Sequence, residues 1–219
     1  ADLFESYVAS IIACLAIGAS TAIAPESADQ SLFLKDSGAS DAGALYMGLP
    51  LLVAVAGQVS SFIGIISIKA LRGRISATAL RTTIFIADIV FIAILALVAG
   101  LMGMSWGLLW AMISGVICGI VLGLLAEYFT SGPPVSRISE QARSGPASVI
   151  ISGLITGMSS TCLPVLAICA AVFSGYYTAG VYGLGIMAVG LIATAGIAAT
   201  VDAYASIADN ACGISGMSG

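Results

Sequence analysis

Histidine is absent from this chain, and charged residues are scarce. Only 8% of the 219 residues are charged, with seven Lys and Arg against eleven Asp and Glu. A soluble domain carries about 25% charged residues, so an ordinary globular or disordered protein is excluded. The lack of a basic surface excludes a nucleic-acid partner. The lack of histidine excludes histidine general-base catalysis and histidine-ligated zinc.

Cysteine is too sparse and too scattered to build a disulfide framework. An odd number of cysteines without metal-ligand spacing also argues against a zinc site. We therefore expect all five to be reduced and mostly buried, as small packing residues. They are Cys14, Cys118, Cys162, Cys169 and Cys212. The chain also lacks a G-x-x-x-x-G-K-[ST] loop, so it does not encode a P-loop ATPase motor.

Hydrophobic residues make up 59% of the chain, and they gather in long runs with almost no charge. A membrane-spanning helix needs about 20 apolar residues. The runs do not alternate as barrel strands would, and backbone groups in lipid need partners within their own segment. The sequence therefore predicts an all-α, polytopic transmembrane bundle with six spans in a single domain, residues 1–219. The expected spans are residues 2–24, 45–68, 82–104, 106–126, 147–174 and 182–208, with hairpin turns near Gly103-Met104-Ser105 and Ser174-Gly175-Tyr176.

The basic residues predict how this bundle is oriented. With six spans, six basic residues fall in connections on the same side as both chain ends, and only Lys35 falls on the other side. The six are Lys69, Arg72, Arg74, Arg81, Arg137 and Arg143. Because Lys and Arg are enriched in cytoplasmic loops, we expect both ends of this chain to be cytoplasmic. The protein would be a multi-pass integral membrane protein, in the cell membrane if it is prokaryotic.

Aromatic residues and the chain ends carry two further expectations. An aromatic belt is expected at the outer interface, formed by Tyr46, Trp106, Trp110, Tyr176, Tyr177 and Tyr182. The chain opens without an initiator Met or a basic signal region and closes on a glycine-rich tail. We therefore expect a piece of a longer polypeptide, truncated at both ends.

Small residues within the spans indicate close helix packing. Gly115, Gly119 and Gly123 are spaced by four, and Gly153 and Gly157 repeat this spacing. Such spacing lets helix backbones approach one another in lipid. Pro164 lies inside the fifth span, where it should kink the helix.

Carboxylates near the membrane mark the candidate functional residues. Asp2, Glu5 and Ser6 lie on one face where the first span begins, and Asp202, Ser206 and Asp209 share a face where the last span ends, with Asn210 adjacent. Because both clusters fall on the same side of the membrane, they could together hold a hard divalent cation such as Mg²⁺. Asp88 lies within the third span, where a carboxylate either forms a structural pair, here with Arg81, or marks an ion path. The structural pair is the favoured interpretation.

Five motifs, in order along nearly the whole chain, resemble those of membrane-integral, ion-pumping pyrophosphatases. The run Asp202–Ile214 resembles the family motif D-A-Y-G-P-I-x-D-N-A-G-G-I, and Asp2–Tyr7 matches D-L-F-E-S-Y. The other three are Glu127–Ser131 (E-Y-Y-T-S), Ser144–Ala147 (T-G-P-A) and Gly157–Leu166 (G-M-E-S-T-A-L-P-V-L). The chain departs from these motifs at Ser159, Ser206, Cys212 and Gly216, which indicates a divergent member.

The resemblance implies a fold and an activity. The chain would be helices six to eleven of a sixteen-helix subunit that works as a homodimer. The full-length protein would hydrolyse Mg²⁺-pyrophosphate and export Na⁺ or H⁺, with K⁺ and Na⁺ as candidate activators. Asp209 matches a Mg²⁺ ligand, Asp202 and Asn210 match neighbouring positions, and Asp2, Glu5 and Ser6 match the ion gate. Most substrate-binding residues would lie outside this chain, so it should be inactive alone.

The position of the gate carboxylate favours Na⁺ over H⁺. In the resembling family, plant-type proton pumps carry glycine where this chain has Glu5 and a glutamate where it has Ala9. A carboxylate at Glu5 is the arrangement of the Na⁺ pumps, although some bacterial proton pumps share it. The alternative hypothesis for the whole protein is a cation-coupled secondary transporter or channel without hydrolytic activity.

Overall fold

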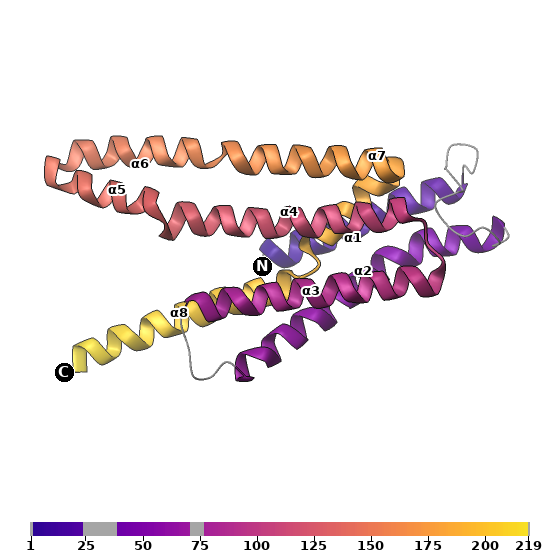
Figure 1. The fold of residues 1–219 in the computed structure, drawn as a ribbon, viewed down its shortest axis with the longest axis horizontal. Helices are drawn as coiled ribbons and strands as arrows, with labels where there is room; N and C mark the ends of the chain where they lie inside the picture. Colours follow the sequence, from indigo (N-terminus) through magenta and orange to yellow (C-terminus); the bar gives the residue numbers. More distant parts are fainter. Residues whose placement is uncertain (1, 24–38, 71–76, 219) are drawn as a thin grey trace.

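The computed structural model describes residues 2–23, 39–70 and 77–218, and these residues are almost entirely helical (Figure 1). The elements are α1 (Asp2–Ile23), α2 (Ala39–Ala70), α3 (Ala77–Met102), α4 (Trp106–Ser131), α5 (Pro133–Gln141), the 3₁₀ turn η2 (Ala142–Ser144), α6 (Pro146–Ser160), α7 (Cys162–Ile192) and α8 (Ala195–Ser218). The described part of the chain contains no strand. The all-α expectation is therefore confirmed.

Four stretches of the described residues are long and apolar enough to cross a membrane. They are Gly43–Ile68, Leu80–Met102, Trp106–Ser144 and Pro146–Ser218, and α1 contributes the shorter apolar segment Phe4–Ser20. The chain is thus a polytopic membrane bundle. The chain reverses direction at Ala179 and Gly180, within the last of these stretches. The number of stretches is therefore not the number of membrane spans. The number six stays a prediction.

The turn between α3 and α4 lies where the sequence predicts it. Gly103 adopts φ 62°, a left-handed conformation that a residue without a Cβ atom reaches without strain. The Ser105 hydroxyl then accepts a hydrogen bond from the Leu108 N–H at 3.4 Å and caps the start of α4. These two residues reverse the chain at the right-hand end of the bundle in Figure 1.

The second hairpin turn lies further along the chain than predicted. Ser174, Gly175 and Tyr176 remain helical, and the chain reverses within α7 at Ala179 (φ −146°, ψ 24°) and Gly180 (φ 60°, ψ −149°). The prediction was wrong because it took Gly175 as the turn glycine. Gly175 instead lies at the contact between the two arms of α7, where an added Cβ atom would come within 3.1 Å of the Gly183 carbonyl oxygen.

Pro164 breaks its helix slightly upstream of its own position. α6 ends at Ser160 and α7 begins at Cys162, with Thr161 between them. A proline ring clashes with the carbonyl group four residues earlier, which here belongs to Ser160. The expected kink is therefore present, and its position follows from the covalent geometry of proline.

α4 packs through glycines against the second arm of α7, the part that follows the reversal at Gly180. An added Cβ atom at Gly119 would lie 2.8 Å from the Leu191 carbonyl oxygen, and one at Gly190 would lie 2.8 Å from that of Met112. Gly115 has even less room, because an added Cβ atom there would overlap the Met187 carbonyl oxygen. Close packing is thus confirmed at Gly115 and Gly119. At Gly123, Gly153 and Gly157, by contrast, an added Cβ atom would meet nothing within 4 Å.

Two of the six aromatic residues expected at the outer interface are core residues instead. Tyr46 and Tyr182 are buried, and their rings meet edge to face with centroids 4.8 Å apart. The Tyr182 hydroxyl donates to the Tyr46 carbonyl oxygen at 2.7 Å, which joins α2 to the second arm of α7. Each of these two tyrosines packs against the other in the core. This pairing joins residues far apart in the sequence, so the spacing of residues along the chain does not reveal it. The other four, Trp106, Trp110, Tyr176 and Tyr177, are exposed.

The cysteines are all unpaired, but most of them are not buried. Cys14 and Cys118 are buried, whereas Cys162, Cys169 and Cys212 are exposed. The expectation of mostly buried cysteines was therefore wrong for this chain. The three exposed cysteines lie on faces of α7 and α8 that no other described helix covers, and an apolar face in a membrane protein can meet lipid or further protein.

A pair of glycine substitutions tests the packing of α4 on α7. We expect Gly115→Ala to lower the melting temperature of the full-length protein, because a methyl group forced against the Met187 backbone costs about 1–3 kcal/mol. Gly123→Ala is the matched control on the same helix. It should leave stability unchanged or raise it by up to about 1 kcal/mol through helix propensity. Equal effects of the two substitutions would contradict the contact.

Candidate functional site

The carboxylates of the last span lie along one continuous helix. α8 carries Asp202, Ser206 and Asp209 at intervals of four and three residues, so they share a face, as expected. Asp202, Asp209 and Asn210 are all exposed, and the Ser206 hydroxyl donates to the Asp202 carbonyl oxygen at 3.2 Å. These side-chain oxygens are therefore free to meet ligands supplied by other parts of the protein.

The carboxylates of the first span lie at the start of α1. Glu5 and Ser6 are exposed on this helix, which begins at Asp2. The neighbouring Tyr7 hydroxyl donates to the Ala54 carbonyl oxygen at 3.0 Å and so fixes the start of α1 to α2. Figure 1 shows this end of α1 near the middle of the long axis, whereas α8 continues well beyond it to the C-terminus.

The two clusters do not form one metal site within the part of the chain that the structure describes. No three Asp, Glu, Cys or His residues there are grouped closely enough to hold a metal ion. The side chain of Asp2 lies outside the described residues, so the shared divalent-cation site considered from the sequence stays a prediction. Two separate sites, with a metal at Asp209 and an ion gate at Asp2, Glu5 and Ser6, stay a prediction.

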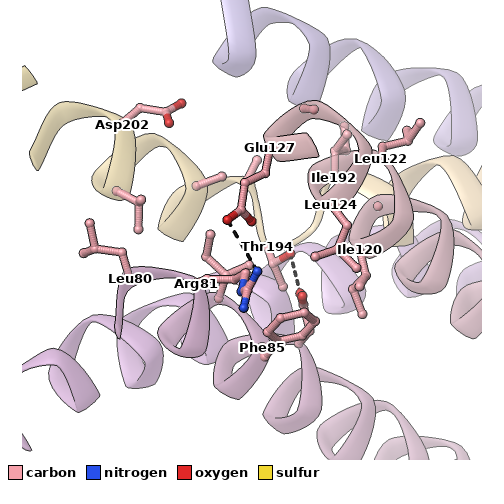
Figure 2. Close-up of a pocket in the computed structure, with 18 of the residues that line it drawn as sticks. Leu80, Arg81, Phe85, Ile120, Leu122, Leu124, Glu127, Ile192, Thr194 and Asp202 are labelled. Atoms are coloured by element: carbon pink, nitrogen blue, oxygen red, sulfur yellow. Dashed lines mark hydrogen bonds and ion pairs between the residues drawn. The ribbon is translucent and has the colours of Figure 1, made fainter. Parts of the chain in front are cut away.

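A cavity of about 680 Å³ lies beside α8, between α3, α4 and the junction of α7 with α8 (Figure 2). Most of its lining is apolar. Its charged lining residues are Arg81, Asp88, Glu127 and Asp202. Asp202 thus faces a space that contains further charged groups, and sequence spacing alone did not bring these groups together.

The charged residues of the cavity pair differently from the sequence-based expectation. The Arg81 guanidinium forms an ion pair with Glu127 at 3.4 Å, and the Thr194 hydroxyl donates to Oδ1 of Asp88 at 2.9 Å (Figure 2). The suggested pairing of Asp88 with Arg81 was therefore wrong. Glu127 lies on α4 and Thr194 between α7 and α8, at sequence separations that no helical periodicity reports.

Four of the seven basic residues lie outside the described residues, either wholly or with their side chain. Lys35, Arg72 and Arg74 lie outside the described residues, as does the side chain of Lys69. Arg81 near the start of α3, Arg137 in α5 and Arg143 in η2 are described. By the order of the helices, these three lie toward the same end of the bundle as the start of α1 and the end of α8 (Figure 1).

Comparison with known proteins identifies the family. The family model described as inorganic H⁺ pyrophosphatase matches residues 1–219. The chain therefore belongs to this family of membrane pyrophosphatases, as its motifs indicate.

Individual relatives bear the names of ion pumps. The chain is 34% identical to a putative K⁺-stimulated pyrophosphate-energized sodium pump of Clostridium tetani and 36% identical to one of Bacteroides thetaiotaomicron. It is 30% identical to the K⁺-insensitive pyrophosphate-energized proton pump 2 of Moorella thermoacetica. Each match covers 100% of this chain but only 31%, 30% and 32% of the respective relative. The chain thus spans about a third of the length of these relatives.

The ion pair at the mouth of the cavity should contribute little to stability. Because the Arg81 and Glu127 side chains are 46% and 43% exposed, solvent screens their attraction, and such pairs are worth about 0–1 kcal/mol. We expect Glu127→Gln to lower the melting temperature of the full-length protein no more than Glu140→Gln, a matched loss of an exposed carboxylate on α5. A loss as large as that from Gly115→Ala would contradict this description of the pair.

Proposed function

We propose that this chain is the central part of a membrane pyrophosphatase. In the full-length protein it contributes to hydrolysis of Mg²⁺-pyrophosphate and to export of a cation, with Na⁺ favoured over H⁺. The observation that carries the proposal is the family match over all 219 residues. It is supported by the exposed carboxylates on α8 and α1, which fall at the motif positions for substrate metal and gate.

The residues at the end of α8 have the donor chemistry that Mg²⁺ prefers. Asp209 offers carboxylate oxygens and Asn210 an amide oxygen, and Asp202 lies about two turns earlier on the same helix. Mg²⁺ takes six oxygen ligands, so other parts of the protein, the phosphate oxygens and water must complete the set. When bound, the metal neutralises charge on the phosphoryl oxygens. Asp209 contributes by holding it at a defined position, and this chain alone is expected to be inactive.

The start of α1 is the proposed ion gate. Asp2, Glu5 and Ser6 provide two carboxylates and a hydroxyl within two helical turns, a compact oxygen site suited to a dehydrated Na⁺. A proton would need only one carboxylate with a raised affinity for protons. Two of the relatives bear the name of K⁺-stimulated sodium pumps. This supports Na⁺ as the exported ion and K⁺ as an activator.

The remaining parts of the proposal concern the assembly and its orientation. The protein works as a homodimer, and both ends of this chain face the cytoplasm, where Mg²⁺-pyrophosphate would reach Asp209. The three described arginines of the basic connections, at the same end as Asp209, support this orientation.

Substitution of the metal ligand tests the hydrolytic part of the proposal. In membranes that carry the full-length protein, Asp209→Asn should lower Mg²⁺-dependent phosphate release from pyrophosphate by at least about tenfold, which corresponds to about 1.4 kcal/mol. The Mg²⁺ concentration at half-maximal rate should rise, because a charged oxygen ligand becomes neutral. Glu140→Gln, which removes a carboxylate from α5, should leave both quantities unchanged. Wild-type activity of Asp209→Asn at limiting Mg²⁺ would reject Asp209 as a ligand.

Ion uptake tests the gate and the choice of ion. Sealed vesicles with the full-length protein should take up ²²Na⁺ when pyrophosphate is added outside, and hydrolysis should rise with Na⁺. We expect Glu5→Ala to abolish both responses, since it removes a carboxylate from the oxygen site. If the wild-type vesicles acidify without ²²Na⁺ uptake, H⁺ is the exported ion and the Na⁺ assignment is wrong.

A further inference from the structure

The helix that carries Asp202 and Asp209 begins at a break in the chain. α7 ends at Ile192 and α8 begins at Ala195, so Ala193 and Thr194 lie between the two helices. Around this junction the hydrogen bonds span three residues rather than four, from the Ala193 N–H to Gly190 at 3.4 Å and from the Ile197 N–H to Thr194 at 3.1 Å. The direction of α8, and with it the position of its carboxylates, is therefore set at this junction.

α2 holds one side of the junction by backbone contact. Gly57 packs so closely against the Ala193 carbonyl group that an added Cβ atom would overlap it. One turn later, an added Cβ atom at Gly196 would lie 3.5 Å from the Ser61 side chain. Ile197 of α8, which is fully buried, also packs beside Gly64 of α2, and together these contacts limit how near α8 comes to α2.

α3 holds the other side through a polar contact. Asp88 is only 4% exposed, and its Oδ1 accepts the hydrogen bond from the Thr194 hydroxyl at 2.9 Å. Thr194 directly precedes α8, so the carboxylate lies near the N-terminal end of that helix, where a negative charge is favoured by the helix dipole. No other hydrogen bond to Asp88 is present among the described residues, which makes Thr194 its specific partner there.

We propose that Asp88 is a positioning residue for hydrolysis and pumping. Through Thr194 it fixes the start of α8 against α3, so that Asp202 and Asp209 are held in register with the rest of the site. The role rests on the function proposed above. It also explains why a carboxylate, which is expensive within a membrane span, occurs at a site where an apolar residue would fill the same volume.

Thr83 of α3 is a buried threonine whose hydroxyl does not join two parts of the chain. It is buried on the same helix, at 1% exposure, but its hydroxyl donates to the Leu80 carbonyl oxygen within α3. That bond lies within α3 and does not reach α8. Thr83→Val is therefore the matched control for Thr194→Val, since both exchange a hydroxyl for a methyl group.

The first measurement uses the full-length protein in sealed vesicles. Thr194→Val and Asp88→Leu should each raise the Mg²⁺ concentration at half-maximal pyrophosphate hydrolysis and lower the number of cations transported per pyrophosphate by at least twofold. The double variant should be no worse than either single variant, because both remove the same bond. Thr194→Ser, which keeps the donor, and Thr83→Val should match the wild type.

These quantities separate positioning from a merely structural role. Transport per pyrophosphate and half-saturating Mg²⁺ do not depend on how much folded protein is present. If Thr194→Val lowers only the yield or the melting temperature, and leaves both quantities at their wild-type values, the proposal is overturned. The same holds if Thr194→Ser is as defective as Thr194→Val.

A second measurement does not require hydrolysis. Spin labels at Ile89 on α3 and Ile207 on α8, both exposed here, report the distance between the two helices in a variant without the native cysteines. Thr194→Val should broaden or shift the distance distribution, and Thr83→Val should not. An unchanged distribution in Thr194→Val overturns the positioning role. If wild-type protein does not hydrolyse pyrophosphate, the proposed function fails, and this distance still decides whether Asp88 positions α8.

Discussion

Most of this structure depends on the need of backbone N–H and C=O groups in lipid to find partners within the protein. In a chain with so few charged residues, helices meet that need. Many hydroxyl groups within the helices donate to a carbonyl group of their own helix, as those of Ser60, Thr83 and Ser114 do, and a few polar groups instead join distant parts of the chain. The Tyr182 hydroxyl bonds to Tyr46, and Thr194 bonds to Asp88. The first contact joins α2 to α7 and the second joins α3 to the junction of α7 with α8, so both contribute to how the bundle is assembled.

The same constraint explains where glycine is used. Without a hydrophobic driving force between helices in lipid, close backbone contact and hydrogen bonds provide the association. Gly115 and Gly119 allow α4 to approach the second arm of α7, and Gly57 does so for α2 at the start of α8. The helix with the candidate metal ligand is thus fixed at its first residues, whereas its last turns are exposed and open to other parts of the protein.

The helical class, the Gly103 turn and the family could be predicted from the sequence, because apolar run length and motif order are local signals. The turn at Gly180 could not, since Gly175 and Gly180 look alike in sequence and only the packing of the two arms tells them apart. The partners of Asp88 and Arg81 were missed for a similar reason. Glu127 lies on α4 and Thr194 between α7 and α8, and Thr194 is an isolated hydroxyl in an apolar run.

A structure of the full-length protein with Mn²⁺ and a non-hydrolysable pyrophosphate analogue would test the two-site arrangement most directly. Mn²⁺ takes the same oxygen ligands as Mg²⁺ and can be located by its anomalous scattering. We expect a metal ion bound to Asp209 and the analogue, with Asp2, Glu5 and Ser6 in a separate cluster nearer the middle of the membrane. Asp209 facing lipid, or all of these carboxylates gathered around one metal, would contradict the assignment of hydrolysis to the end of α8 and gating to the start of α1.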